Sequence, residues 1–480
     1  MSEKLRVDLC IIGAGSAGLS VAAGASQLGA RVVLCESRAM GGDCLNYGCV
    51  PSKSVIAAAR AAEAIRTAPR FGVRAGAPEI DYAALRAHVR GVIAAIAPND
   101  SVERFTGLGV RVTRAKAGFT GPDTVEAGGT VIKARRFVIA TGSSPAVPPI
   151  PGLVRDGETG GVPFLTNETI FDLAVRPDHL IVIGGGPIGC ELAQAHRRLG
   201  ARVTLIEAQS LLPKDDPELV DFVRRRLRRD GIEILEGAKV ARVEGGAGNL
   251  AVAVLTDGGE RRIAGSHLLV ATGRKPSVDG LDLKAAGVEY TPQGITVDDR
   301  LRTTNKRIFA IGDVTGGYRF THVAGYHAGI VIRNALFRLP AKVDYRAVPW
   351  VTYTDPELAN VGLTEQQAVS RGGPIRILRW PFHDNDRAQT EHETEGLVKV
   401  IATKSGHVLG AGIVGAQAGE LIQLWGLVIA KRLKLGDVAG MIAPYPTRGE
   451  ASKRAAMSFY APKLFAPFTR RLVQLLGRLG

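Results

Sequence analysis

The sequence is poor in two residue types on which many small and secreted proteins depend. Its 480 residues include only 5 cysteines, and aromatic residues make up 5% of the chain. An odd and sparse set of cysteines argues against a framework of structural disulfides. In a reducing compartment, a close pair within such a set is more typical of catalysis than of crosslinking.

Long apolar runs and a signal-peptide pattern are also missing. No stretch of 18 consecutive apolar residues occurs, so the sequence predicts no membrane-spanning helix. The apolar segment 7–12 is too short for the hydrophobic region of a signal peptide, and no small-residue cleavage site follows it. We therefore expect a cytoplasmic protein.

Positive charge is in excess: the formal net charge of the chain is +15. Such an excess can serve nucleic acid, a membrane surface or an acidic partner. The basic residues are spread along the chain, however, without a long Lys/Arg run before the C-terminus. This pattern favours an arginine-rich background, and we expect no nucleic-acid partner.

Two segments share one pattern of strand, glycine-rich turn, helix and strand. The first runs from the strand 7–12 to the strand 31–35, and the second from the strand 180–183 to the strand 201–206. Two copies predict an α/β fold with two Rossmann-like dinucleotide-binding domains. From residue 348 onward no such turn occurs, which indicates a separate C-terminal domain.

The segments between the two copies show other patterns. Residues 53–66 and 82–97 are rich in alanine and predict helices. Residues 120–139 alternate with glycine-rich turns and predict short antiparallel strands. The proline-rich stretch 145–151 is typical of an extended crossing between domains.

The first glycine-rich turn reads G-x-G-x-x-G through Gly13, Gly15 and Gly18. The first glycine permits the tight turn, the second lets a pyrophosphate approach the backbone, and the third lets helix pack on strand. The helix N-terminus then offers free N–H groups to the phosphates. Glu36, at the end of the next strand, is placed to bind a ribose. Flanking strands and this carboxylate make the motif specific.

The second turn repeats the pattern through Gly184, Gly186 and Gly189, and Glu207 ends its second strand. A carboxylate at this place accepts a hydrogen bond from the 2′-hydroxyl of NAD and repels the 2′-phosphate of NADP. The sequence therefore favours NADH as the dinucleotide of this site.

Two cysteines, Cys44 and Cys49, lie five positions apart where a glycine-rich loop leads into a predicted helix. They can meet if the first lies at a distorted helix start, and a helix N-terminus stabilises a thiolate. The alternatives are metal ligation, which needs further ligands that this segment lacks, and two inert thiols. The other three cysteines lie in apolar segments and are expected in the core: Cys10, Cys35 and Cys190.

The stretch 41–53 resembles the redox-disulfide motif of the class I pyridine nucleotide-disulfide oxidoreductases, a family that includes dihydrolipoamide dehydrogenase, glutathione reductase and mercuric reductase. The resemblance covers nearly the whole chain. It is supported by Ala-Thr-Gly at 140–142 and 271–273, by Ile-Gly-Asp at 311–313, and by Thr-Asp-Pro-Glu at 354–357, which is similar to the start of the family's dimerisation domain.

The resemblance implies a domain order and cofactors. FAD would bind a domain formed by residues 1–150 and 277–347, and NAD(H) a domain formed by residues 151–276. An α+β dimerisation domain would follow at 348–480. The protein would be a homodimer with a small-molecule or metal-ion acceptor.

The resemblance also implies roles for single residues. Cys49 would be the thiolate beside the flavin, Cys44 the thiol that meets substrate, and Lys53 would pair with Glu191. Asp313 would bind the ribityl chain, and Thr321 and His322 would precede a helix that faces the flavin. The remaining cofactor-binding positions implied by the motifs are Gly42, Thr141, Gly142 and Gly273.

The chain departs from this family near its C-terminus. Disulfide-reducing members carry His-Pro-Thr followed by Glu, and here Glu450 is present but Tyr445 replaces the histidine. Tyrosine titrates far above neutrality and is a poor base. A disulfide or dithiol acceptor is the leading interpretation, and a metal-ion or quinone acceptor is the alternative. We predict no resident metal site.

Residues 466–480 form a basic, amphipathic tail. Four apolar side chains share one helical face: Phe468, Leu472, Leu475 and Leu479. Three cations lie elsewhere around the helix: Arg470, Arg471 and Arg478. Such a segment can lie on an anionic membrane surface or dock on the dimerisation domain, and the sequence leaves both open.

Overall fold

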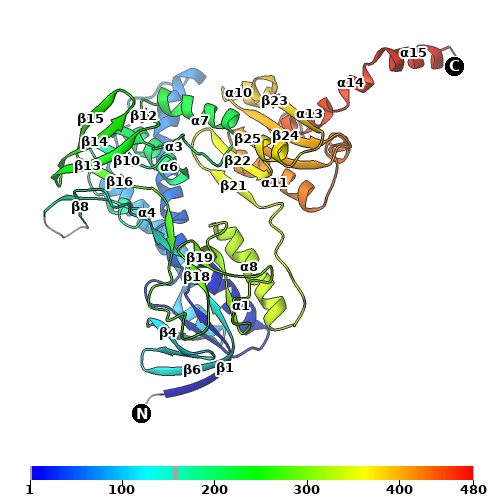
Figure 1. Cartoon of the computed structure of the whole chain (residues 1–480). Coiled ribbons are helices and arrows are strands. Elements are labelled where there is room, and N and C mark those ends of the chain that lie inside the picture. The colour runs from blue at the N-terminus through cyan, green and yellow to red at the C-terminus, as the bar shows by residue number, and fades with distance from the viewer. Residues whose placement is uncertain (1–2, 155–159, 479–480) are drawn as a thin grey trace. The chain divides into compact units, whose positions relative to one another are not determined.

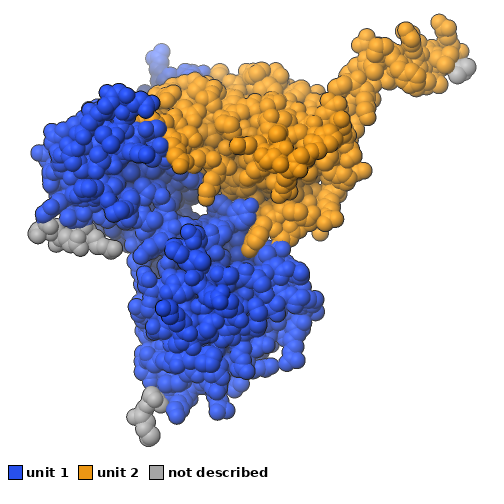
Figure 2. Space-filling model, viewed as in Figure 1, with its two compact units in different colours: residues 1–208, 237–343 blue, residues 209–236, 344–480 orange. Residues whose placement is uncertain are grey.

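The computed structural model describes residues 3–154 and 160–478 (Figure 1). Contacts divide the chain into two compact units (Figure 2). Unit 1 comprises residues 1–208 and 237–343, and unit 2 comprises residues 209–236 and 344–480. The finer four-part division into cofactor and dimerisation domains stays a prediction.

The first sheet of unit 1 is built around β1 (Glu3–Ile12), which is parallel to β2 (Val32–Cys35) and to β6 (Thr130–Ile139). The strand β3 (Arg111–Thr113) extends it beyond β2. The helix α1 (Ser16–Gln27) packs on β1 and β2 through small buried residues. The first predicted strand–turn–helix–strand unit is therefore present.

An antiparallel meander continues this sheet, as the alternating pattern predicted. It consists of β4 (Ala117–Gly121), β5 (Thr124–Ala127) and β6. Further along the same edge of β6 that β5 occupies, β20 (Ile308–Ala310) pairs with β6 in parallel, and α8 (Thr321–Ala335) packs against α1. The late segment 301–335 thus completes the layer that begins at the N-terminus.

Of the two helices predicted between the repeats, the second begins at residue 82 as predicted, and the first starts earlier. A short helix, α2 (Gly42–Asn46), is followed by α3 (Cys49–Thr67) and α4 (Tyr82–Ile96). The prediction that helix begins at Lys53 is wrong, because Pro51 lies inside the first turn of α3. A proline is tolerated there, since the N–H that it lacks would have no intrahelical acceptor.

The second repeat has the same parallel core. The strand β10 (His179–Ile183) lies between β11 (Arg202–Ile206) and β16 (His267–Val270), and α6 (Pro187–Arg198) connects the first two strands. A separate antiparallel sheet follows, formed by β13 (Lys239–Gly246), β14 (Asn249–Thr256) and β15 (Gly259–Gly265).

The crossing between the repeats is a two-stranded ladder. Here β7 (Ser143–Pro145) pairs antiparallel with β17 (Arg274–Pro276). These two strands directly follow the Ala-Thr-Gly segments 140–142 and 271–273, which end β6 and β16. The predicted crossing at 145–151 begins at this ladder.

Unit 2 contains a five-stranded antiparallel sheet in the order β21-β22-β25-β24-β23. Its strands are β21 (Pro349–Thr352), β22 (Glu357–Gly362), β23 (Ile375–Pro381), β24 (Leu397–Thr403) and β25 (Val408–Gly415). The helices α11 (Ala418–Ala430), α13 (Glu450–Ser458) and α7 (Pro217–Arg229) pack on it.

The core of unit 2 holds two polar groups that are satisfied internally. Trp425 is fully buried and donates to the Ser452 hydroxyl at 3.1 Å. Lys399, at 3% side-chain exposure, pairs with Asp216, Glu218 and Glu365. Because a buried cation is costly without such partners, this cluster fixes α7 on the sheet.

Shorter elements complete the chain: α5 (Val102–Gly107), β8 (Leu153–Val154), β9 (Val162–Pro163), β12 (Glu233–Leu235), β18 (Tyr290–Thr291), β19 (Gly294–Ile295), α9 (Glu365–Ser370), α10 (Asp386–Thr390), α12 (Leu435–Gly440), α14 (Ala461–Leu464) and α15 (Pro467–Leu476). None of the helices in the described ranges combines the length and apolarity that a bilayer crossing requires.

Candidate active site

The first glycine loop is shaped by steric contacts that only glycine allows. Gly13 has φ +104°, and a Cβ there would lie 2.4 Å from the Ala140 carbonyl oxygen. A Cβ on Gly18 would lie 1.9 Å from the Gly13 carbonyl oxygen, so α1 can approach β1 only without one. A Cβ built on Gly15 would have no atom nearer than the Gly42 Cα atom, at 3.8 Å, so the backbone on that side can be approached by a ligand.

Glu36 closes this loop from the end of β2. Its carboxylate accepts hydrogen bonds from the Ala14 amide and from the Arg38 amide, both at 2.6 Å. The open backbone at Gly15, the start of α1 and this carboxylate together provide a pyrophosphate site and a ribose acceptor. The residues therefore fit a dinucleotide such as FAD.

The loop that carries the cysteines packs directly on the first glycine loop. Gly42 has φ +59°, and a Cβ there would lie 2.6 Å from the Gly15 Cα atom. An isolated parallel bridge joins Gly15 to Gly41. Because Gly42 has no room for a side chain against Gly15, the cysteine loop lies close to the dinucleotide loop, and Cys44 follows two residues further on.

The two cysteines lie on either side of the break between α2 and α3. Cys44 is in α2, Cys49 is the first residue of α3, and the Cys44 thiol is close enough to Cys49 to be the strongest influence on its pKa. The Cys49 sulfur also lies 3.3 Å from the Thr321 hydroxyl at the start of α8. The pair thus meets at a helix start, as predicted, with the distortion between the two cysteines.

Their acidities are pulled apart. The Cys44 thiol, with smaller contributions from the Thr321 hydroxyl and the charge of Lys53, lowers the pKa of Cys49 to about 6, against the effect of burial. The interaction with Cys49 and burial raise the pKa of Cys44. Cys49 is therefore the thiolate at neutral pH, and Cys44 carries the proton.

Lys53, one turn along α3, pairs with Glu191 of α6 at 2.8 Å. The pairing was expected from the family resemblance. Glu191 is 6% exposed and Lys53 is 38% exposed, so the carboxylate is the more buried partner. This ion pair holds the cationic end of Lys53 in a fixed place near Cys49.

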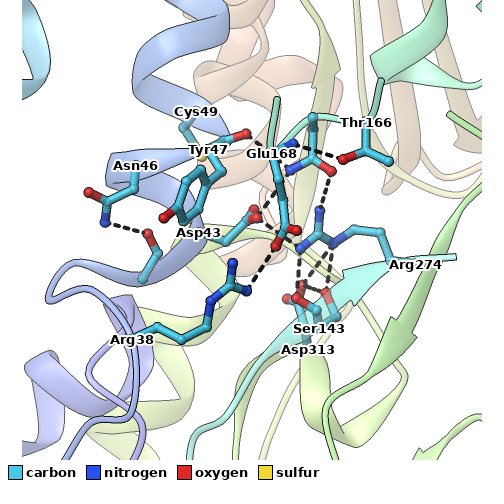
Figure 3. A network of polar contacts seen from close by, with 12 residues as sticks. Arg38, Asp43, Asn46, Tyr47, Cys49, Ser143, Thr166, Glu168, Arg274 and Asp313 are labelled. Atoms are coloured by element: carbon cyan, nitrogen blue, oxygen red, sulfur yellow. Dashed lines mark hydrogen bonds and ion pairs between the residues drawn. The ribbon is translucent and has the colours of Figure 1, made fainter. Parts of the chain in front are cut away.

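Arg274 forms the centre of a polar network that sequence reasoning missed (Figure 3). Its guanidinium donates to the Ser143 hydroxyl at 2.7 Å and to the Ser143 carbonyl at 2.8 Å, and it pairs with Asp43 at 3.1 Å. Asn167 donates to the Asp43 carboxylate and to the Tyr47 carbonyl. The network fixes the start of α2, and so the segment next to Cys44.

Asp313 lies at the edge of the same network. It accepts a hydrogen bond from Ser143 at 2.6 Å, and burial raises the pKa of its carboxyl. Thr141 donates to the Ser277 carbonyl at 2.7 Å, and the Ser277 amide donates to the Gly142 carbonyl. Gly273 begins the turn into β17 with φ +138°. The predicted cofactor residues of these segments are therefore brought together.

The start of α8 differs from its prediction. Thr321 and His322 do not precede the helix but form its first turn. His322 is exposed and stacks on Phe320 at 5.2 Å between ring centroids. A second histidine, His327, was missed: its Nδ1 accepts the Gly312 amide at 3.1 Å, and burial lowers its pKa to about 4, so it stays neutral.

The second glycine loop repeats the first. A Cβ on Gly184 would lie 2.4 Å from the Ala271 carbonyl oxygen, and one on Gly189 would lie 1.8 Å from the Gly184 carbonyl oxygen. A Cβ built on Gly186 would have no other atom within 4 Å, so this side of the backbone is open. Glu207 accepts the Gly185 amide at 2.7 Å. The residues fit a second dinucleotide.

Comparison with known protein families decides the assignment. Residues 7–328 match the model described as pyridine nucleotide-disulphide oxidoreductase, and residues 348–456 match the dimerisation domain of the same family. The chain belongs to this family. It is an oxidoreductase that uses FAD and NAD(P)H, with the fold expected from the sequence.

The curated relatives of this chain include mercuric reductases and dihydrolipoyl dehydrogenases. Mercuric reductase of Bacillus cereus is 39% identical over 455 residues, which cover 94% of this chain and 71% of the relative. Dihydrolipoyl dehydrogenase of Bacillus subtilis is 32% identical over 462 residues, which cover 94% and 98%. Both groups support the reading of a flavoprotein disulfide oxidoreductase without choosing between acceptors.

Solved structures agree. LpdA from Mycobacterium tuberculosis aligns with a TM-score of 0.86 at 28% identity, covering 94% of this chain and 99% of that one. The HOCl-induced flavoprotein disulfide reductase RclA from Escherichia coli aligns with a TM-score of 0.82 at 28% identity, covering 94% and 99%.

The dimerisation domain of this oxidoreductase carries the two C-terminal residues singled out from sequence. Tyr445 is 70% exposed and donates to Asp386 at 2.8 Å, and this hydrogen bond raises the pKa of the phenol. Glu450 begins α13 and pairs with Arg454 at 3.0 Å. Tyr445 is therefore held as a protonated donor. Asp386 was not predicted, because its contact with Tyr445 spans 59 residues.

A resident metal finds no support in the part of the chain that the structure describes. Within it, no group of three or more His, Cys, Asp or Glu side chains is arranged to hold an ion. The three remaining cysteines, Cys10, Cys35 and Cys190, are buried, as expected.

Proposed function

We propose that this oxidoreductase takes hydride from NADH and passes the electron pair through FAD and the Cys44–Cys49 pair to an acceptor that reacts with thiols. The observation that carries the proposal is the asymmetry of the two cysteines. Cys49 is acidified to a pKa of about 6, while the pKa of Cys44 is raised. FAD, when bound, supplies the chemistry that links hydride transfer to two-electron reduction of a disulfide.

The residues divide this work between them. Glu36 and the first glycine loop would hold the adenosine end of FAD, and Asp313, hydrogen-bonded to Ser143, would orient the flavin's side chain. Lys53 and Thr321 hold the negative charge of Cys49. Following the family resemblance, Cys44 is the thiol that meets the acceptor, and it gives up its proton when it attacks.

For a disulfide acceptor the overall reaction is NADH + H⁺ + RSSR → NAD⁺ + 2 RSH. The Cys44 sulfur attacks one acceptor sulfur and the acceptor disulfide breaks. Cys49 then attacks Cys44, which restores the cysteine disulfide and releases the second acceptor thiol. A disulfide is the leading acceptor, because the cysteine pair itself is a disulfide-exchange device.

Tyr445 favours a second candidate, a thiol-binding metal ion. Its phenol is held protonated by Asp386, so it can donate a hydrogen bond but cannot serve as the base that assists disulfide exchange. Mercuric reductases are among the relatives. For a divalent ion the balance is NADH + M²⁺ → NAD⁺ + M + H⁺. We also propose that NADH is preferred over NADPH, because Glu207 stands at the ribose position. We further propose that the protein is a homodimer, because it carries the family's dimerisation domain.

The proposal is tested by anaerobic titration of the holoenzyme with NADH, beside Cys44→Ser and Cys49→Ser. The reduced native enzyme is expected to show the long-wavelength band of a thiolate beside flavin, half-developed near pH 6 and lost as pH falls further. In Cys44→Ser the midpoint should move to higher pH, because the thiol that lowers the pKa of Cys49 is gone. Equal behaviour of all three proteins would show that the cysteine relay is idle.

The acceptor is tested by Tyr445→His. If the missing base limits disulfide reduction, this variant should gain turnover with lipoamide or oxidised glutathione by roughly 10²-fold, the usual contribution of a general base. Asp386→Asn is the matched control, because it alters the partner of the phenol without supplying a base. Reduction of mercuric ion by the native enzyme, with no gain from Tyr445→His on disulfides, would favour the metal.

A further inference from the structure

The C-terminal tail, residues 461–478, is an apolar surface that nothing in unit 2 covers. It contains α14 and α15, whose hydrogen bonds join neighbouring turns of the tail. Every described side chain from 470 to 478 is exposed, and Phe468 reaches 76% exposure. Figure 2 shows the tail projecting from the rest of unit 2. The match to the family's dimerisation domain ends earlier, at residue 456.

Four large apolar side chains lie on one side of α15, and Val473 lies outside this face. At about 100° per residue, Phe468, Leu472, Leu475 and Leu476 fall within an arc of about 100°. Leu479, which was predicted to continue this face, lies outside the described residues. An exposed apolar stripe of this kind is costly in water and marks a surface that meets a partner.

The charges of the tail have one sign. No acidic residue follows Glu450, whereas Lys463, Arg470, Arg471 and Arg478 are cationic. On the same helical wheel, Arg471 and Arg478 lie about 90–110° from the centre of the apolar face, and Arg470 lies opposite it. Flanking cations can reach anionic headgroups while the apolar face enters the acyl boundary.

We infer that residues 461–478 bind the surface of a membrane that contains anionic phospholipid. Charge complementarity selects this occupant: a surface that contains anionic phospholipid is negatively charged, and the charged side chains of the tail are all cationic. A docking groove on a second copy of a chain with net charge +15 would need local acidic partners instead. The binding is peripheral, so the cofactor and cysteine sites would act at the membrane surface.

The test is cosedimentation of the full-length holoenzyme with vesicles of phosphatidylcholine alone or mixed equally with phosphatidylglycerol. Binding to the mixed vesicles, weakened by salt, is expected. Arg471→Gln with Arg478→Gln, the two flanking cations, should weaken it roughly 25-fold, at about fivefold per cation. Arg371→Gln with Arg376→Gln is the matched control: it removes the same charge from exposed positions outside the tail and should change binding little.

The apolar face is tested by Leu472→Ser with Leu475→Ser, which should reduce binding by at least about tenfold per leucine. Val473→Ser, on the same helix but about 100–120° from the centre of the face, is its control. Flavin absorbance and the thermal midpoint should be unchanged, because no side chain of α15 is buried. Absence of vesicle binding by the native protein would overturn the inference. If the leucine variant were then also monomeric while the native protein is dimeric, the tail would be placed on a second copy of the chain.

Discussion

The two glycine loops of unit 1 are nearly identical in their steric design. Gly13 and Gly184 have φ values of +104° and +114°, and a Cβ on either would lie 2.4 Å from a carbonyl oxygen. At Gly18 and Gly189 the corresponding distances are 1.9 and 1.8 Å. The same backbone problem, a helix packed against the strand that precedes it, is solved twice.

The loops differ two residues after the third glycine. In α1 this place is Ser20, which donates to the Ser16 carbonyl and is exposed. In α6 it is Glu191, which is buried and binds Lys53. The first loop is also in contact with Gly42 and the cysteine loop. The shared loop geometry therefore suits both loops to a dinucleotide, and the residues that differ around it, such as Glu191, connect one of them to Lys53 and the cysteine pair.

The largest effect is expected from adding a methyl group at the glycine whose Cβ position lies closest to a carbonyl oxygen of its loop. Gly18→Ala places a Cβ 1.9 Å from the Gly13 carbonyl oxygen, so α1 must shift. We expect a loss of about 3 kcal/mol or more of stability and a protein purified without flavin. Flavin absorbance per chain and thermal unfolding would measure this.

Gly189→Ala sharpens the comparison, because its clash is the same size in the other loop. This variant should keep its flavin and lose reduction by NADH. Gly91→Ala is the control: Gly91 is exposed within α4 and has no atom within 4 Å of its Cβ position, so this change should be neutral or stabilising. If Gly189→Ala lost flavin as readily as Gly18→Ala, the loops would not serve different dinucleotides.

Local sterics explain why so much of the fold was visible in the sequence. The glycine spacings of both loops and the five-residue cysteine spacing are set by short-range geometry, and the structure shows both loops as expected. The stretch 41–53 additionally resembles a family motif, and through it the Lys53–Glu191 contact was expected and is present.

Contacts between distant segments explain what was missed. Arg274 binds Ser143 and Asp43, which lie 131 and more residues away, and no local pattern encodes such a meeting. His327 was passed over because a single histidine within a helix has no distinctive spacing. The tail is the reverse case: its amphipathic face was predicted, but a sequence does not show what covers a face.

A smaller effect is expected from the Lys53–Glu191 ion pair, which has no equivalent at Ser20 in the first loop. Lys53→Met removes a charge that lowers the pKa of Cys49, so that pKa should rise by about one unit. The thiolate band of the reduced enzyme would then appear at higher pH. Because Lys53 is partly exposed, the stability lost by leaving Glu191 unpaired should be only about 1–3 kcal/mol.

Two controls separate charge from position. Lys53→Arg keeps the cation and should leave the midpoint near its native value. Ser20→Glu places a carboxylate at the equivalent position of α1, and this exposed side chain should leave Cys49 unaffected. A shift of the midpoint in Ser20→Glu as large as that in Lys53→Met would show that any nearby charge, rather than this pair, sets the acidity of Cys49.

The smallest effect concerns the two carboxylates that close the loops. Glu207→Gln keeps an acceptor for the Gly185 amide but removes the charge beside the ribose of the nicotinamide dinucleotide. The KM for NADH should rise roughly fivefold, the equivalent of about 1 kcal/mol, while that for NADPH should fall because repulsion of its 2′-phosphate is relieved. Stopped-flow reduction of the flavin by each dinucleotide measures both. Glu36→Gln, at the matching position of the first loop, should weaken flavin retention and leave the ratio of NADH to NADPH unchanged. If instead Glu36→Gln altered that ratio and Glu207→Gln did not, the assignment of the two loops to their dinucleotides would have to be exchanged.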